Sequence, residues 1–543
     1  MSRRRYIFLP LGALLTPLLL SLLVPSGSLS GQELPWLRAG RVRLDFAPVF
    51  WGWDSRFGLR KEGSSIIEEV ETLGSDLTAD PLGSPAIPHL RDLEANLADA
   101  LEDPEYRVRL GVSQALVDQS RMTFPFRLEV GVTDWLTVGA MVPLVRTRSE
   151  ITFDLVSDSL SADVGLSPNL LQAGAVASFL EGLQTAVDSA TVLEPENETW
   201  SQAQGFLDAL SAAYTHNSFF PVLGSAAGTM LQERLGNYLS SLEALGIAGA
   251  PTAVPLAGEF LDAAAFREFL TSQSTNMRGW PFENWTAPWA LGDVEITASA
   301  RLLRGGFEAD SLGEFPFLRY QVGGGLLFRL GTGEQADPNR FLPISAGDGQ
   351  ADMEAGVFGL VQLGGWFGAW GHLRLGFQQE GDILRRIAAP SEVFPNWLRL
   401  APLKWTPGNY RELDLNPRIY LNPAMTFGIR YHFWSKEADQ YALGDIDPEV
   451  LERLDYPSVE LLEEETEETL HEVGLSATFS TLEPHARGEA SLPLHIRVTY
   501  FRPVSGSGGQ TPKGGRFEAG ISLFRQLWGG PRMEQAPNNV GGR

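Results

Sequence analysis

The chain has 543 residues, a formal net charge of −25 and no cysteine. The charge disfavours nucleic-acid binding, which requires basic patches, and the lack of cysteine excludes disulfides, thiolate metal sites and a lipoprotein anchor. Glycine is frequent, at 57 residues, and aromatic residues make up 10% of the chain. Both features favour a β-rich protein over a helical one.

The first thirty residues have the layout of a secretory signal peptide. Three arginines at positions 3–5 precede an apolar run, and small residues follow it. This order predicts an exported chain with residues 1–30 removed near Ser30. The alternative is an uncleaved membrane anchor, which the short, proline-broken run disfavours.

Residues 124–145, "FPFRLEVGVTDWLTVGAMVPLV", alternate between apolar and polar or small side chains on both sides of Thr133-Asp134. This period of two is typical of strands with one apolar face. Twelve segments are of this kind, and each is long enough for a tilted strand of about 9–11 residues across a bilayer. They are 41–53, 119–133, 135–148, 291–305, 316–330, 350–363, 366–379, 411–421, 424–435, 468–480, 491–502 and 515–528.

The connections between these segments alternate in length. Short ones lie at 133–134, 364–365 and 422–423, whereas the longest are 54–118, 149–290, 331–349, 380–410 and 436–467. Short turns at one end and long loops at the other are typical of outer-membrane barrels. We therefore predict an all-β membrane protein, an antiparallel transmembrane β-barrel of about twelve strands over residues 40–528. The alternating face would contact lipid of the bacterial outer membrane. A large soluble β-sandwich or propeller is the alternative.

Residues 157–288 interrupt this pattern with helical spacing. Val176, Phe179, Leu183 and Val187 fall on one face of a helix. We expect a helical, extracellular insertion within the barrel domain, either a cap outside the barrel or a plug lowered into its lumen. Residues 529–543 form a C-terminal tail beyond the last predicted strand.

Four segments carry a resemblance to a known family. They are 128–145, 291–303, 323–338 ("GGGLLFRLGTGEQADP") and 347–356 ("GDGQADMEAG"), in that order. In these segments the chain resembles the outer-membrane barrel family named for the meta-cleavage pathway of phenol degradation. The resemblance implies a transporter of aromatic or other apolar solutes. The long insertion and the extension past Trp528 depart from the family pattern, and the latter makes the usual C-terminal signal for the barrel-assembly machinery doubtful or internal.

The predicted inward faces of the strands carry arginines and carboxylates in similar numbers. Arginine pairs well with carboxylates because its planar fork donates two parallel hydrogen bonds. The pattern predicts a structural salt-bridge lattice, a lined solute path, or both. The candidate lumen-lining residues are Arg127, Glu129, Asp293, Glu295, Arg301, Arg319, Arg329, Glu354, Arg374, Arg418, Arg430 and Arg497.

Two aromatic stretches, 280–289 and 394–405, should lie on the extracellular side. Aromatic rings at a channel mouth bind apolar solutes, although rings of an outer interface girdle would give the same pattern. The candidate mouth residues are Trp280, Phe282, Trp285, Trp289, Phe394, Trp397 and Trp405.

Motifs of enzymes, metal sites and cofactor sites are absent, and the seven histidines are scattered. We expect no catalytic residue, metal or cofactor. The sequence predicts an outer-membrane channel or transporter for small apolar or aromatic solutes. The alternative is a structural or surface-binding barrel with a closed lumen. An acyl-cleaving barrel enzyme is a third, weaker interpretation, because no Ser-His spacing marks one.

Overall fold

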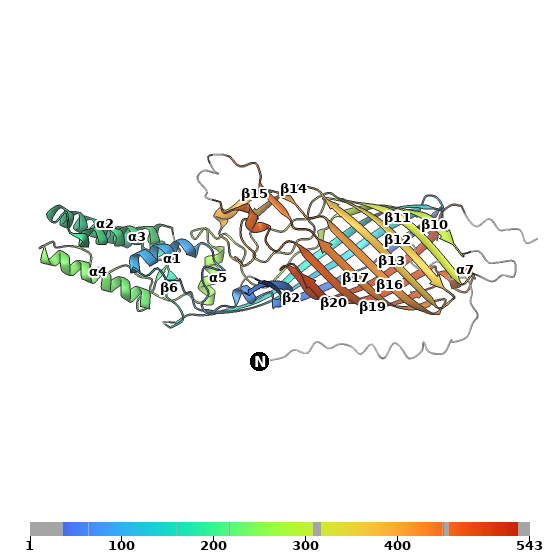
Figure 1. Cartoon of the computed structure of the whole chain (residues 1–543), viewed down its shortest axis with the longest axis horizontal. Coiled ribbons are helices and arrows are strands. Elements are labelled where there is room, and N and C mark those ends of the chain that lie inside the picture. The colour runs from blue at the N-terminus through green and yellow to red at the C-terminus, as the bar shows by residue number, and fades with distance from the viewer. Residues whose placement is uncertain are drawn as a thin grey trace, which may run out of the picture.

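The computed structural model describes residues 36–62, 65–158, 160–216, 218–307, 316–447, 449 and 456–529. The predicted signal peptide and residues 530–543 of the predicted tail lie outside this range. Within it, the chain forms a closed antiparallel β-barrel with a helical unit beyond one end (Figure 1). The barrel strands are β1 (Arg41–Phe46), β2 (Val49–Glu62), β4 (Val112–Gly131), β5 (Leu136–Val156), β10 (Val294–Gly305), β11 (Leu318–Leu330), β12 (Asp352–Leu363), β13 (Phe367–Gln378), β16 (Tyr410–Asn422), β17 (Met425–Lys436), β19 (Glu468–Ser480), β20 (Leu494–Ser507) and β21 (Thr511–Gln526).

The ring closes between the first and last strands. Strands β1 and β2 follow each other along the same edge, because both pair with β4 on one side and β21 on the other. Counting them as one, the described residues form a ring of twelve antiparallel strands. The predicted twelve-stranded barrel is confirmed.

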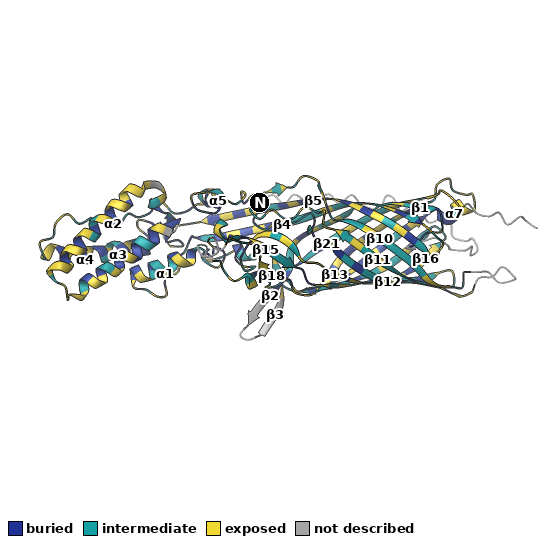
Figure 2. Ribbon diagram, turned by 90° about the horizontal axis from the view of Figure 1, so that it is seen from above, coloured by how far each residue is buried: buried dark blue, intermediate teal, exposed yellow. Residues whose placement is uncertain are grey.

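The outer surface of the ring is apolar. Side chains that alternate with the inward positions are exposed on nearly every strand, as the striped pattern of Figure 2 shows. An apolar surface that encircles the protein is tolerated in lipid but not in water. These side chains include Leu44, Phe126, Leu128, Val142, Ile296, Leu326, Phe328, Val357, Leu373, Leu375, Ile419, Phe427, Ile429, Leu475, Val498, Ile521 and Leu523.

One end of the barrel carries short connections and the other carries long ones; we call them the turn side and the loop side. On the turn side, β4 and β5 are joined by residues 132–135, where the Thr133 hydroxyl accepts a hydrogen bond from the Leu136 amide at 3.0 Å. A short helix, α7 (Leu482–Ala486), lies on the same side, between β19 and β20. Both described chain ends, at β1 and β21, also lie there.

The helical unit stands at the loop side, at the end of the long β4–β5 hairpin (Figure 1). Its helices lie outside the ring, so the described part of the insertion is not a plug. Among the described residues, no helix has the length and apolarity needed to span a membrane. The unit contains α1 (Leu90–Leu101), α2 (Pro168–Leu193), α3 (Glu198–His216), α4 (Ala226–Ala244), α5 (Ala263–Thr271) and the strand pair β6 (Val164–Leu166) and β7 (Phe219–Pro221).

One buried apolar cluster holds this unit together and continues toward the barrel. It includes Leu90 of α1, Phe153 of β5 and Tyr214 of α3, and it reaches Phe341 and Phe394 in two loop-side connections. Helix α1 comes from the 54–118 connection, for which no secondary structure was predicted from the sequence. It packs on α3 and α4 because Leu90, Leu93 and Leu97 repeat at helical spacing and are fully buried.

The remaining elements decorate the loop side. Strands β14 (Gly381–Arg386), β15 (Leu400–Thr406) and β18 (Gln440–Leu443) form a small sheet over their own apolar cluster. The segments 380–410 and 436–467, predicted as long loops, therefore contain regular structure. The other elements are β3 (Ser65–Thr72), β8 (Trp285–Thr286), β9 (Ala290–Leu291) and the 3-10 helices η2 (Ser75–Leu77), η3 (Trp397–Arg399) and η4 (Val459–Leu462).

Candidate functional site

A cavity of about 660 Å³ occupies the middle of the barrel. Inward side chains line it from β1 and β4 round to β21, because the alternation that turns apolar residues to lipid turns their neighbours to the lumen. The lining is mixed. It combines arginines and carboxylates with the rings of Phe358, Trp370 and Phe524 and with His372 and His495.

Seven of the twelve predicted lumen residues line this cavity, and they are Arg127, Glu129, Glu295, Glu354, Arg374, Arg430 and Arg497. The other five lie elsewhere inside the barrel. Asp293 and Arg329 lie toward the loop side, whereas Arg301, Arg319 and Arg418 lie close to the turn side of their strands. Arg319 and Arg418 are buried.

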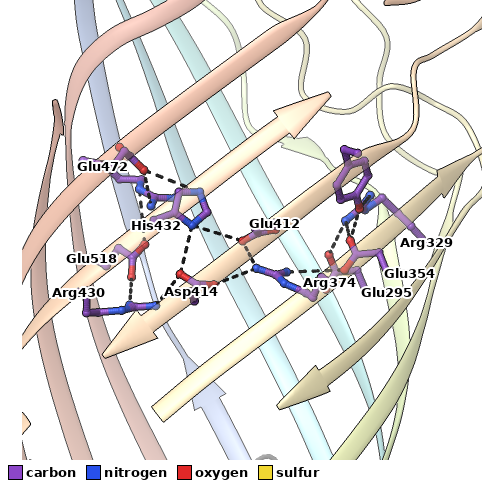
Figure 3. A network of polar contacts seen from close by, with 12 residues as sticks. Glu295, Arg329, Glu354, Arg374, Glu412, Asp414, Arg430, His432, Glu472 and Glu518 are labelled. Carbon is purple, nitrogen blue, oxygen red and sulfur yellow. Dashed lines mark hydrogen bonds and ion pairs between the residues drawn. The ribbon is translucent and has the colours of Figure 1, made fainter. Parts of the chain in front are cut away.

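Ion pairs connect many of these side chains into one network across the inner wall (Figure 3). Arg374 is central to it: its guanidinium contacts Glu412, lies 3.3 Å from Asp414 and 3.6 Å from Glu354. Arg329 lies 2.8 Å from Glu354 and 3.5 Å from Glu295, on the adjoining strands. The predicted salt-bridge lattice is therefore present.

The network continues through β16, β17, β19 and β21. Arg430 lies 3.5 Å from Asp414 and 3.3 Å from Glu518, and Arg516 lies 2.7 Å from Glu472. Pairing of this kind keeps charged groups satisfied where few waters reach them, because an unpaired buried charge is far more costly.

His432 lies among three carboxylates of this network. Its Nδ1 is 3.1 Å from Asp414 and 3.5 Å from Glu412, and its Nε2 is 3.9 Å from Glu472. The donor atoms of Glu412, Asp414 and His432 lie within 4.8 Å of one another, close enough to hold a metal ion. Arg374 contacts both carboxylates, so a metal would have to displace an existing ion pair. The arrangement fits the salt-bridge lattice better than a metal site.

The turn side of the cavity is covered by the residues that precede β1. Trp36 stacks on the inward ring of Phe358, with centroids 5.3 Å apart. The Leu37 amide donates a 2.6 Å hydrogen bond to the hydroxyl of Thr137, which is also buried in the lumen. The segment around Trp36 therefore narrows the barrel from the turn side. The segment was not predicted from the sequence, because it precedes the first alternating segment.

The loop side of the lumen is covered by residues 331–351. Inward side chains of β4 hold this loop: Gln119 donates to the Leu342 carbonyl at 3.1 Å and Arg121 donates to the Ala346 carbonyl at 2.9 Å. The Asp293 carboxylate accepts hydrogen bonds from the amides of Gly333 at 2.7 Å and Asp348 at 3.1 Å.

The predicted mouth aromatics split into three groups. Phe282 and Phe394 are buried, and their rings meet at 5.0 Å in the apolar cluster of the helical unit. The prediction that they line an open mouth is therefore wrong, because apolar rings in a folded connection pack into the nearest core. Trp289 instead packs against Phe124 on the outer face of β4, at 4.7 Å, as expected of the alternative girdle.

The remaining four rings lie around the loop-side connections. Trp280 is exposed and donates to Asp337 at 2.7 Å, and Arg340 lies over Trp285 at 4.3 Å. Trp397 lies under the guanidinium of Arg278 at 4.0 Å. Trp405 belongs to the small sheet, stacked with Tyr441. Of the predicted mouth aromatics, only these four remain candidates for contact with a solute.

A buried arginine ties these connections together. Arg386 donates to the Pro395 carbonyl at 2.7 Å and to the Asn339 side chain at 3.0 Å, so it joins the 331–351 and 387–399 segments. Burial lowers the pKa of Arg386 to about 10, and Asp337 opposes the shift. In the same region, burial and, after it, the neighbouring carboxylates of Asp293 and Asp352 raise the pKa of Asp348 to about 6.

No protein-family model and no curated protein matches the chain. Solved structures of outer membrane channels are similar to it at low identity. An outer membrane channel from Pseudomonas putida F1 is 8% identical, with a TM-score of 0.38, over 92% of this chain and 100% of that chain. The CymD monoaromatic hydrocarbon channel is 8% identical, with a TM-score of 0.24, over 91% of this chain and 90% of that one. A deletion mutant of the TodX monoaromatic hydrocarbon channel is 10% identical, with a TM-score of 0.26, over 91% of each chain.

Proposed function

We propose that this chain is a bacterial outer-membrane channel for small apolar or aromatic solutes. The observation that carries the proposal is the cavity of about 660 Å³ inside a closed ring, lined by both charged and aromatic side chains. A purely structural barrel has no use for such a space, whereas pockets that bind small molecules combine apolar walls with a few polar groups. The resemblance of residues 128–145, 291–303, 323–338 and 347–356 to the meta-cleavage pathway family implies the same solute class.

The solute path runs from the loop side, past the 331–351 loop, through the cavity and past Trp36. The helical unit and the exposed Trp280 lie at the start of this path, and the lipid-facing ring anchors it in the outer membrane. The chain would reach that membrane as an exported precursor, its first thirty residues acting as the signal peptide and the barrel-assembly machinery inserting it. Seven residues around the cavity, including Arg127 and Arg497, are the candidate lining.

The alternative is a barrel with a closed lumen whose helical unit binds something at the cell surface. The covering elements favour it, since Trp36 and the 331–351 loop lie at opposite ends of the cavity. The two functions differ in whether small molecules cross the ring.

Purified protein in planar lipid bilayers and in liposomes distinguishes these functions. Heat-modifiable migration first shows that the barrel is folded. A channel gives discrete conductance steps and lets small solutes swell liposomes. A folded barrel that gives neither conductance nor swelling would reject the channel and leave the surface-binding barrel.

A further inference from the structure

The charges inside the barrel are separated along its axis. Near the turn side, within about four residues of the strand ends, the inward side chains include more arginines than carboxylates. These arginines are Arg41, Arg43, Arg127, Arg301, Arg319, Arg418 and Arg497. The carboxylates at the same level, among the described residues, are Asp45, Glu129, Glu295, which pairs with Arg127 at 3.5 Å, and Glu483 of α7.

The loop-side half has the opposite balance. Its inward carboxylates are Asp293, Asp352, Glu354, Glu412, Asp414, Glu472 and Glu518. The inward arginines at that level are Arg121, Arg329, Arg374 and Arg516, with Arg430 between the halves. The near balance of charges over the whole lumen therefore hides a basic half on the turn side and an acidic half on the loop side.

The cavity extends into the basic half and has an aromatic wall there. Phe358 of β12 meets the ring of His372 of β13 at 5.5 Å, and Trp370 lies 5.8 Å from the same histidine. All three residues line the cavity. Flat rings in this arrangement present faces and edges on which an aromatic solute can stack.

An arginine wall faces this aromatic wall. Arg43 and Arg127 line the cavity from β1 and β4, and β4 lies four strands from β12 in the ring of twelve. The side chain of Arg127 is 37% exposed, more than Arg43, Arg329, Arg374, Arg430 or Arg516, and its ion pair with Glu295 is long, at 3.5 Å. Its guanidinium therefore has N–H groups free to bind an anion, since five donors face a single distant carboxylate.

We propose that the cavity selects aromatic carboxylates, with the ring against Phe358 and Trp370 and the carboxylate on Arg127. This inference rests on the proposed channel function and names its solute class. A neutral hydrocarbon would leave the remaining N–H groups of Arg127 unused, and an aromatic cation would meet more arginines than carboxylates at this level. A guanidinium–carboxylate pair is among the stronger polar contacts that a protein can offer, because its hydrogen bonds are charge-assisted.

Calorimetry on the full folded chain in a non-ionic detergent tests the selectivity, with three probes that share one ring. Benzoate should bind at least about tenfold more tightly than benzyl alcohol or benzylammonium, since charge-assisted hydrogen bonds exceed neutral ones. Equal affinity for benzoate and benzyl alcohol would overturn the proposal in favour of neutral solutes. Tighter binding of benzylammonium would also overturn the proposal, because it would show that the carboxylates of the loop-side half determine which solute binds.

Two arginine variants separate the site from general charge. Arg127→Ala should weaken benzoate binding about tenfold, as expected for the loss of one charge-assisted pair, and Arg127→Lys should recover part of it. Arg301→Ala is the matched control, because Arg301 is an inward arginine at the same level that does not line the cavity. Equal losses in the two alanine variants would reject a site at Arg127.

Conductance recorded on the same preparations tests the channel function separately from the solute class. Conductance without benzoate preference would reject only the solute class. Benzoate binding without conductance would reject the channel and leave a binding barrel.

Discussion

Replacing His89 with phenylalanine should remove a pH-dependent weakness of the helical unit. His89 immediately precedes α1, and its ring stacks on Phe269 at 5.5 Å and on Phe219 at 6.2 Å. Neither ring nitrogen has a hydrogen-bond partner among the described residues. Burial and, to a smaller extent, the nearby Arg399 guanidinium lower the pKa of His89 to about 4.

The direction of the pH effect follows from this depressed pKa. The folded unit keeps His89 neutral, whereas the unfolded segment takes up a proton near the ordinary pKa of 6.5. The stability that depends on the neutral ring is complete above pH 6.5 and is lost as the pH falls toward 4. At pH 5, linkage between these two values gives a loss of about 2 kcal/mol in the unfolding free energy.

Hydrogen exchange of peptides from α1 to α5 measures this loss without separating the unit from the barrel. In the wild-type chain, opening should become easier by about 2 kcal/mol between pH 8 and pH 5 after correction for intrinsic exchange. His89→Phe should remove most of this difference while keeping the ring stack. His485→Phe is the control, because His485 is exposed on the turn side. An unchanged pH dependence in His89→Phe would refute the reasoning.

Three further outcomes test the covering elements and the insertion. Trp36→Ala should raise single-channel conductance by about twofold or more, because the substitution removes a large indole ring from the narrow turn-side part of the lumen. Trp135→Ala, which changes an exposed residue, should not raise the conductance. Asp293→Ala should free the 331–351 loop by removing two charge-assisted hydrogen bonds of about 1.5–3 kcal/mol each, seen as faster hydrogen exchange there than in the exposed control Asp382→Ala. Deleting residues 160–276 alone should leave an aggregation-prone barrel, because α1 loses its partners α3 and α4. Removing 75–111 as well, together with the projecting ends of β4 and β5, should restore a monodisperse, heat-modifiable protein; two deletions that behave alike would contradict this.

The barrel was predictable because successive side chains of each strand face two different environments, lipid outside the ring and the lumen inside it. Lipid accepts apolar side chains and a wet lumen accepts charged ones, so a pair such as Leu128 and Glu129 shows which face is which. The same rule placed Arg127, Arg374 and Arg497 on the cavity wall. It did not identify the aromatic wall, because an inward Phe358 or Trp370 has the same chemistry as a lipid-facing residue and only the register of its strand shows its direction.

The loop-side elements were less predictable because their partners are distant in sequence. Leu90, Leu93 and Leu97 already stand at helical spacing, and that signal could have identified α1. Nothing local shows that α1 packs on helices more than a hundred residues later. Phe282 and Phe394 follow the same logic: their aromatic character was visible, but whether they face solvent or a core depends on the fold of both connections.

The sequence of the β4–β5 hairpin shows where the hairpin leaves the membrane. Within the ring, five apolar side chains of β5 stand at even positions and face outward, namely Leu136, Val138, Ala140, Val142 and Leu144, and Met141 is an inward exception. Beyond the ring they stand at odd positions and are buried against the helical unit: Ile151, Phe153 and Leu155. The strand keeps its period of two throughout, so the apolar face changes sides between positions 144 and 151.

A continuous strand changes its apolar side only where its surroundings change, because lipid lies outside the ring while a protein core lies on the opposite face beyond it. Such a phase change in an alternating segment therefore predicts a strand that outgrows the bilayer, and in this chain it also explains how the helical unit is held away from the ring on a rigid support.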